Sequence, residues 1–237
     1  MGYRGTAYAG WAAQPGQTTV QSVIEAALAR AFGHPVRAIA AGRTDAGVHA
    51  DGQVVSFSTT AGLPTSALPH VMPQWLPPDV WPIEAADVAA GFDARRAARR
   101  RWYRYAVWRG SVPPSGWHGR ALAHPEDLDL SAMRAASRSL LGKHDFAAFA
   151  TQPPPERSTT RTVVAADWLE LGPLLMFEVC ADGFLKQMVR SLVGSMLWVG
   201  GKHRTPEQFA AALANADRRA AGPNAPAHGL TLSRIEY

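Results

Sequence analysis

The order of helical and extended segments predicts an α+β protein built from two tandem α+β halves with mainly antiparallel strands. Hydrophobic spacing switches between helical and extended periods in each half of the sequence. The length of 237 residues allows two small domains, and a chain that is 47% hydrophobic and 18% charged is typical of globular proteins. We place the boundary near residues 92–100, which gives halves of 1–97 and 98–237.

The first half is expected to open its main helix after Thr18, with Gln21 completing a capping box. Apolar residues then recur at helical spacing until Gly33 ends the helix. Short extended segments follow at 36–41 and 52–58, and the prolines of 61–82 predict a long irregular connection.

The second half begins with a strand rich in aromatic residues at 102–108. Thr205 caps a helix that has Pro206 at its first position, which is a strong start signal. The other expected elements are a helix at 130–141 closed by Gly142, a proline loop at 152–157, a β-hairpin of 162–171 and 174–181, a helix at 184–199 and a final strand at 230–237.

The charge balance points to a polyanionic partner. The net charge is +5 and the pI about 9.8, with arginine supplying 21 of the 24 basic residues. Six arginines lie among Trp102, Tyr103 and Tyr105, where cations can meet phosphates and rings can stack on bases: Arg95, Arg96, Arg99, Arg100, Arg101 and Arg104. The alternatives are codon bias and a solvated helix end, and the interleaved aromatics favour nucleic acid.

The single cysteine, Cys180, excludes an intramolecular disulfide and zinc motifs that need cysteine pairs. The longest apolar stretch, 188–199, is too short to span a bilayer and carries Arg190. Without a signal-peptide pattern at the N-terminus, we expect an intracellular protein that does not enter a membrane.

The densest cluster of polar and glycine residues is Gly42-Arg43-Thr44-Asp45-Ala46-Gly47-Val48-His49. It follows an expected strand, and its two glycines would let the backbone approach a ligand closely. Asp45 at its centre is the candidate catalytic carboxylate. The alternative is that Asp45 caps a backbone N–H in a turn, which is the commoner role of an aspartate in such a loop.

This cluster resembles the catalytic signature of the tRNA pseudouridine synthase A family. Further similarities run in order along essentially the whole chain. They are Tyr3-x-Gly5-Thr6-x-Tyr8-x-Gly10-Trp11, Thr19-Val20-Gln21, Gly52-Gln53-Val54-Val55-Ser56-Phe57, Phe92-x-Ala94-Arg95, Tyr103-Arg104-Tyr105, Leu141-Gly142-x-His144-Asp145-Phe146, Phe184-x-x-x-Met188-Val189-Arg190-x-Leu192-Val193-Gly194 and Gly229-Leu230-x-Leu232.

The resemblance implies an isomerase that converts uridine to pseudouridine at positions 38 to 40 of the tRNA anticodon stem-loop. It also implies a cytoplasmic homodimer whose two pseudo-symmetric halves form a central basic cleft, working without metal or organic cofactor. The first half, 1–97, would carry the catalytic loop, and the second, 98–237, would complete the cleft.

The resemblance also assigns roles to four residues. Asp45 would be the essential carboxylate, and Tyr103 would meet the target uracil. Arg190 would lie beside the carboxylate, and Arg43 would displace the target base or hold a neighbouring phosphate. From pattern alone, Tyr103 could be a core residue, Arg190 could extend outward to solvent, and Arg43 could form a surface ion pair.

Two other function classes remain open from the residues themselves. One is an RNA-binding protein that uses the same basic surface without catalysis. The other is a metal-dependent nuclease or phosphatase built on Asp45, His49 and Asp51, for which the sequence offers no further ligand at suitable spacing.

The chain departs from the family pattern near its start. Arg4 stands where the family usually has aspartate, and Met1 falls inside the family's first strand, so either the start is misassigned or the edge strand there is shortened. Other departures are Ala12, Asp93 and Gln74-Trp75.

Overall fold

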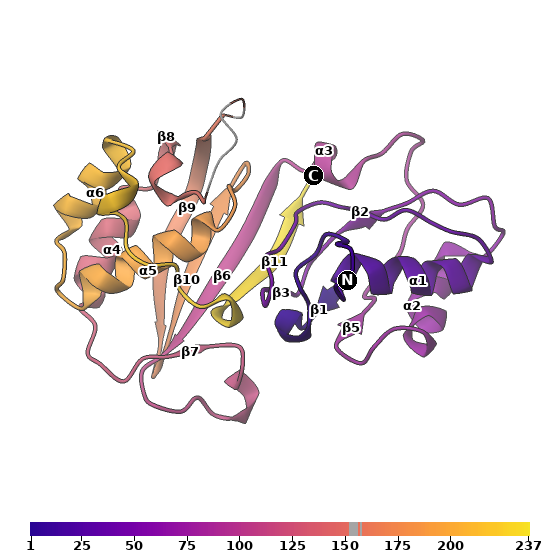
Figure 1. Ribbon diagram of the computed structural model, residues 1–237, viewed down its shortest axis with the longest axis horizontal. Coiled ribbons are helices and arrows are strands. Elements are labelled where there is room, and N and C mark those ends of the chain that lie inside the picture. The colour runs from indigo at the N-terminus through magenta and orange to yellow at the C-terminus, as the bar shows by residue number, and fades with distance from the viewer. Residues whose placement is uncertain (152–155, 157) are drawn as a thin grey trace. The chain divides into compact units, whose positions relative to one another are not determined.

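The computed structural model describes residues 1–151, Glu156 and 158–237. Its chain divides into two compact units (Figure 1). The first unit contains Met1–Arg99 together with Thr231–Tyr237, and the second contains Arg100–Leu230. The sequence-based boundary lies at 97/98, and the division in the structure lies at 99/100 with the last seven residues grouped in the first unit.

The sheet of the first unit has the strand order β5 (Val80–Trp81), β1 (Gly2–Tyr3), β3 (His49–Ala50) and β11 (Leu230–Glu236). The first three of these strands have two residues each, and β11 has seven. β1 is antiparallel to both neighbours, and β11 is parallel to β3. β2 (Ile39–Ala40) and β4 (Val55–Ser56) form a separate antiparallel pair. The expectation of a shortened edge strand at the start is wrong in one respect, because β5 covers the outer side of β1.

Helix α1 (Val20–Phe32) is the main helix of the first unit. Its N-cap is Thr19 rather than the expected Thr18, and Thr19 forms a reciprocal capping box with Ser22. Gly33 ends it at a positive φ of 74°, as expected for a left-handed C-cap. The interval 61–82 is not wholly irregular, because it contains α2 (Leu68–Val71), two single-turn helices η2 (Thr65–Ala67) and η3 (Met72–Gln74), and β5.

Two short helices complete this unit, η1 (Gly5–Ala7) and α3 (Ala94–Ala97). Asp93 caps α3 by accepting from the backbone N–H groups of Arg95 and Arg96.

The second unit has a longer antiparallel sheet in the order β6 (Arg100–Trp108), β10 (Leu174–Ala181), β9 (Thr160–Leu171) and β8 (Gly142–Asp145). β7 (Leu122–Ala123) pairs in parallel with β6. The predicted hairpin of β9 and β10 is confirmed, with Gly172 at a φ of 62° in its turn.

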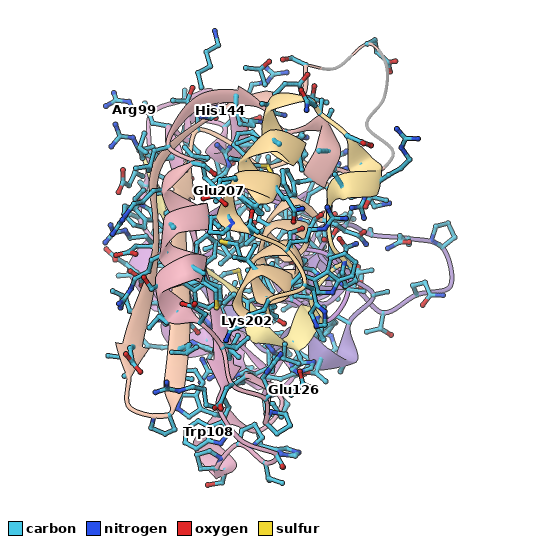
Figure 2. All side chains as sticks on the ribbon, turned by 90° about the vertical axis from the view of Figure 1, so that its left-hand side faces the viewer. Arg99, Trp108, Glu126, His144, Lys202 and Glu207 are labelled. Carbon is cyan, nitrogen blue, oxygen red and sulfur yellow. The ribbon has the colours of Figure 1, made fainter. Side chains whose placement is uncertain are left out.

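Three helices cover one face of this sheet: α4 (Leu130–Arg138), α5 (Met188–Gly200) and α6 (Pro206–Ala214). Figure 2 views this helical side, where Lys202 precedes α6 and Glu207 lies in its first turn. α5 begins four residues later than expected, because Gln187 adopts a left-handed conformation that ends the preceding loop. Gly142 is not the helix stop that we expected: α4 ends at Arg138, and Gly142 begins β8.

The remaining short helices of the second unit are η4 (Ser115–Trp117), η5 (Ala147–Phe149), η6 (Arg218–Ala220) and η7 (Ala227–Gly229). Except for Glu156, the predicted proline loop at 152–157 lies outside the described residues.

The core of the second unit lies between the sheet and its helices. Tyr105, Phe177 and Trp168 occupy paired positions on three neighbouring strands and are fully buried. The indole N–H of Trp168 contacts the sulfur of Met196 on α5 at 3.4 Å. Full burial of each such side chain contributes roughly 1.5–3 kcal/mol, so this face fixes the strands against the helices. No helix within the described residues is long and apolar enough to cross a membrane.

Candidate active site

The predicted catalytic loop connects β2 to β3 in the first unit. The side chains of this loop differ in exposure from one residue to the next. Arg43 is exposed, Thr44 is 6% exposed and Asp45 is half-buried. The backbone oxygen of Asp45 accepts from the N–H of Val48 at 3.1 Å, which closes a turn. The Asp45 side chain is therefore not sealed in the core, and the inward position is taken by its neighbour Thr44.

Three buried polar side chains lie beneath this loop, and we call Tyr3, Thr44 and Gln53 the buried clamp. The hydroxyls of Tyr3 and Thr44 are 2.8 Å apart. The Gln53 side chain donates to the carbonyl of Gly42 at 2.7 Å and accepts from the Gly42 N–H at 3.3 Å. The same Gln53 nitrogen lies 3.3 Å from the Tyr3 hydroxyl, so the clamp is one connected network.

The backbone of the opening segment holds the loop from a second side. The Trp11 N–H donates to the carbonyl of Thr44 at 3.0 Å, and the Gly47 N–H donates to the carbonyl of Tyr8 at 3.4 Å. Gly10 has a φ of 97°, and a Cβ built there would lie 2.9 Å from the Thr44 oxygen. The glycine at this position therefore permits the close approach of the two segments.

The two residues proposed with Asp45 as metal ligands have other partners. His49 is fully buried, and its Nδ1 accepts from the Gly5 N–H at 3.0 Å. Asp51 pairs with Arg4 at 3.5 Å, and Arg4 also lies over the Trp81 ring at 5.2 Å. Across residues 1–151, 156 and 158–237, no group of three or more His, Cys, Asp or Glu side chains is placed to hold a metal.

Tyr103 belongs to the second unit, on β6 opposite Val179 of β10. It is 7% exposed, and its ring meets Phe184 edge-to-face with the centroids 5.0 Å apart. Phe184 lies in the segment that leads into α5. Tyr103 is thus held by strand pairing and by aromatic packing, and the ring has little rotational freedom.

Arg190 is the third residue of α5 and is half-buried. Its Nε donates to the carbonyl of Ala225 at 2.8 Å, and its own carbonyl accepts from the Ala225 N–H at 2.9 Å. The Tyr105 hydroxyl donates to the neighbouring carbonyl of Pro226 at 2.8 Å. Arg190 is therefore anchored to a packed segment and does not extend freely into solvent.

The positive charge of Arg190 also acts on Tyr105. Burial raises the pKa of the Tyr105 phenol well above its ordinary range, and the Arg190 charge offsets part of this shift. The phenol remains neutral and keeps its donor role toward Pro226.

The basic cluster predicted from the sequence divides between the two units. Arg95, Arg96 and Arg99 are exposed in the first unit, on and after α3. Arg100 is exposed at the start of β6 in the second unit, where Arg101 donates to the carbonyl of Asp182 at 2.7 Å.

The structure thus places Arg43 and Asp45 on one loop of the first unit, and Tyr103 and Arg190 on regular elements of the second. The roles assigned to these four residues stay predictions. Sequence reasoning missed the buried clamp. A signal was present, because Gln53 is a polar residue just before an apolar extended run and Thr44 separates the two candidate charged residues.

Comparison with known proteins gives consistent matches over the whole chain. The family described as tRNA pseudouridine synthase matches residues 1–95 and 136–237. The tRNA pseudouridine synthase A of Moorella thermoacetica is 44% identical over 244 residues, covering 100% of this chain and 97% of the relative. The enzymes of the same name from Syntrophotalea carbinolica and Geobacter sulfurreducens are 40% and 41% identical, each over 99% of this chain and 93% and 96% of the relative.

The family match includes the loop that carries Asp45 and the helix that carries Arg190, whereas Tyr103 lies in the interval 96–135, which is covered by the pairwise match to the Moorella thermoacetica enzyme. The chain therefore belongs to the tRNA pseudouridine synthase A family of isomerases.

Proposed function

We propose that this protein isomerises uridine to pseudouridine at positions 38 to 40 of the tRNA anticodon stem-loop, with Asp45 as its essential carboxylate. The proposal rests on full-length family membership. Its support in the structure is the half-buried Asp45 on a loop whose neighbouring residues Gly42 and Thr44 are fixed by hydrogen bonds.

The reaction rearranges a nucleotide without net gain or loss of atoms. The bond between N1 of uracil and C1′ of ribose breaks, the base turns, and C5 bonds to C1′. The proton leaves C5, and N1 gains a proton. A carboxylate suits this chemistry because it can add covalently to base or sugar, or assist a deprotonation at the sugar. These correspond to attack at C6, attack at C1′ or a glycal route.

We assign substrate-binding roles to three further residues. The Tyr103 ring would stack on the flipped uracil, or its hydroxyl would act in the proton transfer at C5. Arg43 would displace the target base or hold the adjoining phosphate, since the planar guanidinium pairs well with phosphate. Arg190 would lie beside Asp45 and favour its ionised form, because a nearby opposite charge stabilises a carboxylate. Extrusion of a stacked base costs a few kcal/mol, which these contacts would offset.

The proposed form of the enzyme is a cytoplasmic homodimer that needs neither metal nor organic cofactor. The partner is tRNA, which would bind to an arginine-rich surface in a basic cleft. The net charge of +5 and the exposed arginines of 95–100 support a polyanionic partner.

The decisive experiment uses tRNA transcripts with tritium at uridine C5, since isomerisation releases this label into water whereas binding or strand cleavage does not. Wild-type protein should release tritium, with no effect of a chelator. Asp45→Ala should abolish release and still bind tRNA. Asp51→Asn is the matched control, because it removes a carboxylate of the same unit that lies outside the proposed chemistry.

Substrates with a single uridine at 38, 39 or 40 test the position. Release from uridines elsewhere in the tRNA would exclude the anticodon-arm assignment. Normal turnover by Asp45→Ala would exclude the mechanism, and tRNA binding without any release would leave a binding protein. Affinity for tRNA should also fall steeply with salt, because arginine contacts release counterions from the phosphates.

A further inference from the structure

The buried clamp under the candidate loop has no role in the chemistry proposed above. We propose that Gln53, Thr44 and Tyr3 are positioning residues that hold the loop of Arg43 and Asp45 in its reactive geometry. This inference rests on the proposed function of Asp45.

Gln53 extends a strand pair by means of its side chain. Ala40 pairs with Val55, and the Ala41 N–H donates to the carbonyl of Val54 at 2.8 Å. At the next residue, Gly42, both backbone groups bond to the Gln53 side-chain amide instead of a backbone peptide. The ladder therefore ends with a side chain, which lets the chain leave the strand while its last peptide stays fully paired.

Thr44 is the buried residue between the exposed Arg43 and the half-buried Asp45. Its side chain meets Tyr3 of β1, and its carbonyl accepts from Trp11. Rotation of the backbone at Thr44 would move Arg43 and Asp45 together. Both the side chain and the backbone of this single residue are held, so the clamp constrains the direction in which the Asp45 carboxylate projects.

The clamp is buried and internally satisfied. Tyr3 is fully buried, Gln53 is 1% exposed and Thr44 is 6% exposed. Burial raises the pKa of Tyr3 to about 12, so its hydroxyl stays neutral and can donate throughout the pH range of an assay. A satisfied polar network in a low-dielectric interior is rigid, and removal of one member leaves the others unpaired.

Reactive groups need this kind of support. Catalytic side chains must be held within about 0.5 Å of their productive geometry, and a misplacement of about 1 Å can lower a rate by about 100-fold. The clamp acts on backbone next to Asp45 and not on the substrate. Its loss should lower the rate of the chemical step far more than tRNA affinity, because Arg43 is one of several arginines proposed to contact the RNA.

The test measures single-turnover tritium release and tRNA affinity for the full-length protein. Thr44→Val keeps the shape of the side chain and removes its hydroxyl, so the rate should fall by about tenfold or more while the Kd for tRNA changes by much less. Thr44→Ser restores the hydroxyl and should recover most of the lost rate. Gln53→Met, which frees both groups of Gly42, should give the larger loss, about 100-fold.

Tyr3→Phe removes the other end of the same bond and guards against a folding defect in any one variant. Because both single changes remove the hydrogen bond between Tyr3 and Thr44, the double variant Tyr3→Phe/Thr44→Val should lose less rate than the product of the single losses. Ser137→Ala is the matched control. It deletes a fully buried hydroxyl that bonds within α4 of the second unit, so it should change thermal stability without changing the rate.

The outcomes separate this inference from the proposed function. If Asp45→Ala is inactive while Thr44→Val, Tyr3→Phe and Gln53→Met all turn over at the wild-type rate, the positioning role is wrong and the proposed function stands. A rate loss in Ser137→Ala equal to that in Thr44→Val would show a general effect of lost stability and would also overturn it. If Asp45→Ala is active, the proposed function itself fails.

Discussion

The candidate residues of the first unit lie on a loop, whereas those of the second unit lie in regular elements. Arg43 and Asp45 depend on side-chain bonds that reach the loop from Tyr3 of β1 and from Gln53, two residues before β4. Tyr103 is fixed by the ladder between β6 and β10, and Arg190 by the first turn of α5. A loop has no ladder of its own, so its precision must come from a buried polar network, while a strand or helix supplies precision through its backbone.

Close backbone packing provides the strongest test of this comparison. A Cβ at Gly194 of α5 would overlap the carbonyl oxygen of Pro223, in the segment that holds Arg190 through Ala225. Alanine is favoured over glycine in a helix by about 1 kcal/mol. The overlap outweighs this gain, and we expect Gly194→Ala to lower the free energy of unfolding by about 3 kcal/mol. Urea denaturation measures the free energy of unfolding. A variant more stable than the wild type would contradict the close contact between Gly194 and Pro223.

The corresponding change in the first unit is Gly10→Ala. The φ of 97° and the approach to the Thr44 oxygen both oppose a side chain, and the cost should be about 2 kcal/mol. Because Gly10 contacts the candidate loop, single-turnover tritium release should fall as well. Gly16→Ala is the control, since it has a positive φ of 71° and open space around its Cβ. Equal rate losses in the two variants would argue against loop positioning.

The capping boxes of α1 and α6 allow the same change in both units. Thr19 is fully buried and bonds to Ser22, whereas Thr205 is exposed and bonds to Gln208. Loss of an N-cap costs about 1 kcal/mol. Thr19→Ala should lower the stability more than Thr205→Ala, because it leaves the part-buried N–H of Ser22 without its hydrogen-bond partner. The melting temperatures of the two variants measure this difference. A lower melting temperature for Thr205→Ala than for Thr19→Ala would contradict the prediction.

The two candidate arginines should respond differently to lysine. Arg190→Lys removes the Nε donor to Ala225 and should cost about 1 kcal/mol of stability. Arg43 is exposed, so Arg43→Lys should leave the melting temperature unchanged. Arg43→Lys should weaken tRNA binding, because lysine lacks the planar fork of arginine. A loss of stability in Arg43→Lys but not in Arg190→Lys would contradict the view that Arg190 is fixed in α5 and Arg43 is not.

The smallest expected effect is a pH dependence in the second unit. Burial lowers the pKa of His228, and a hydrogen bond with the backbone of Ala121 offsets part of this shift. Below about 6.5 the unfolded chain therefore takes up a proton more readily than the folded protein, and stability falls as pH decreases. His228→Asn should flatten the stability profile below about pH 6.5. Removal of the exposed imidazole in His118→Asn is the control.

Elements with local signals could be predicted from the sequence. The capped helix α6, the hairpin of β9 and β10, and the strand β6 all follow from caps, turn residues and hydrophobic period. Boundaries that depend on single backbone conformations could not. Gln187 has a φ of 60°, a left-handed conformation that a glutamine side chain does not favour and that the sequence therefore does not predict. As a result α5 begins only at Met188. The N-cap of α1 is likewise set by one backbone conformation, because it is Thr19, in an extended conformation, that accepts from the Ser22 N–H rather than the expected Thr18.

The candidate loop could be located from the sequence, because the eight consecutive residues from Gly42 to His49 resemble the family's signature. Its support was decided only by tertiary structure. Tyr3 and Thr44 are separated by 41 residues, and β5 exists because Val80 and Trp81 meet the two residues of β1. Contacts between distant segments leave no period or cap in the sequence, since they depend on where the whole chain brings each backbone group.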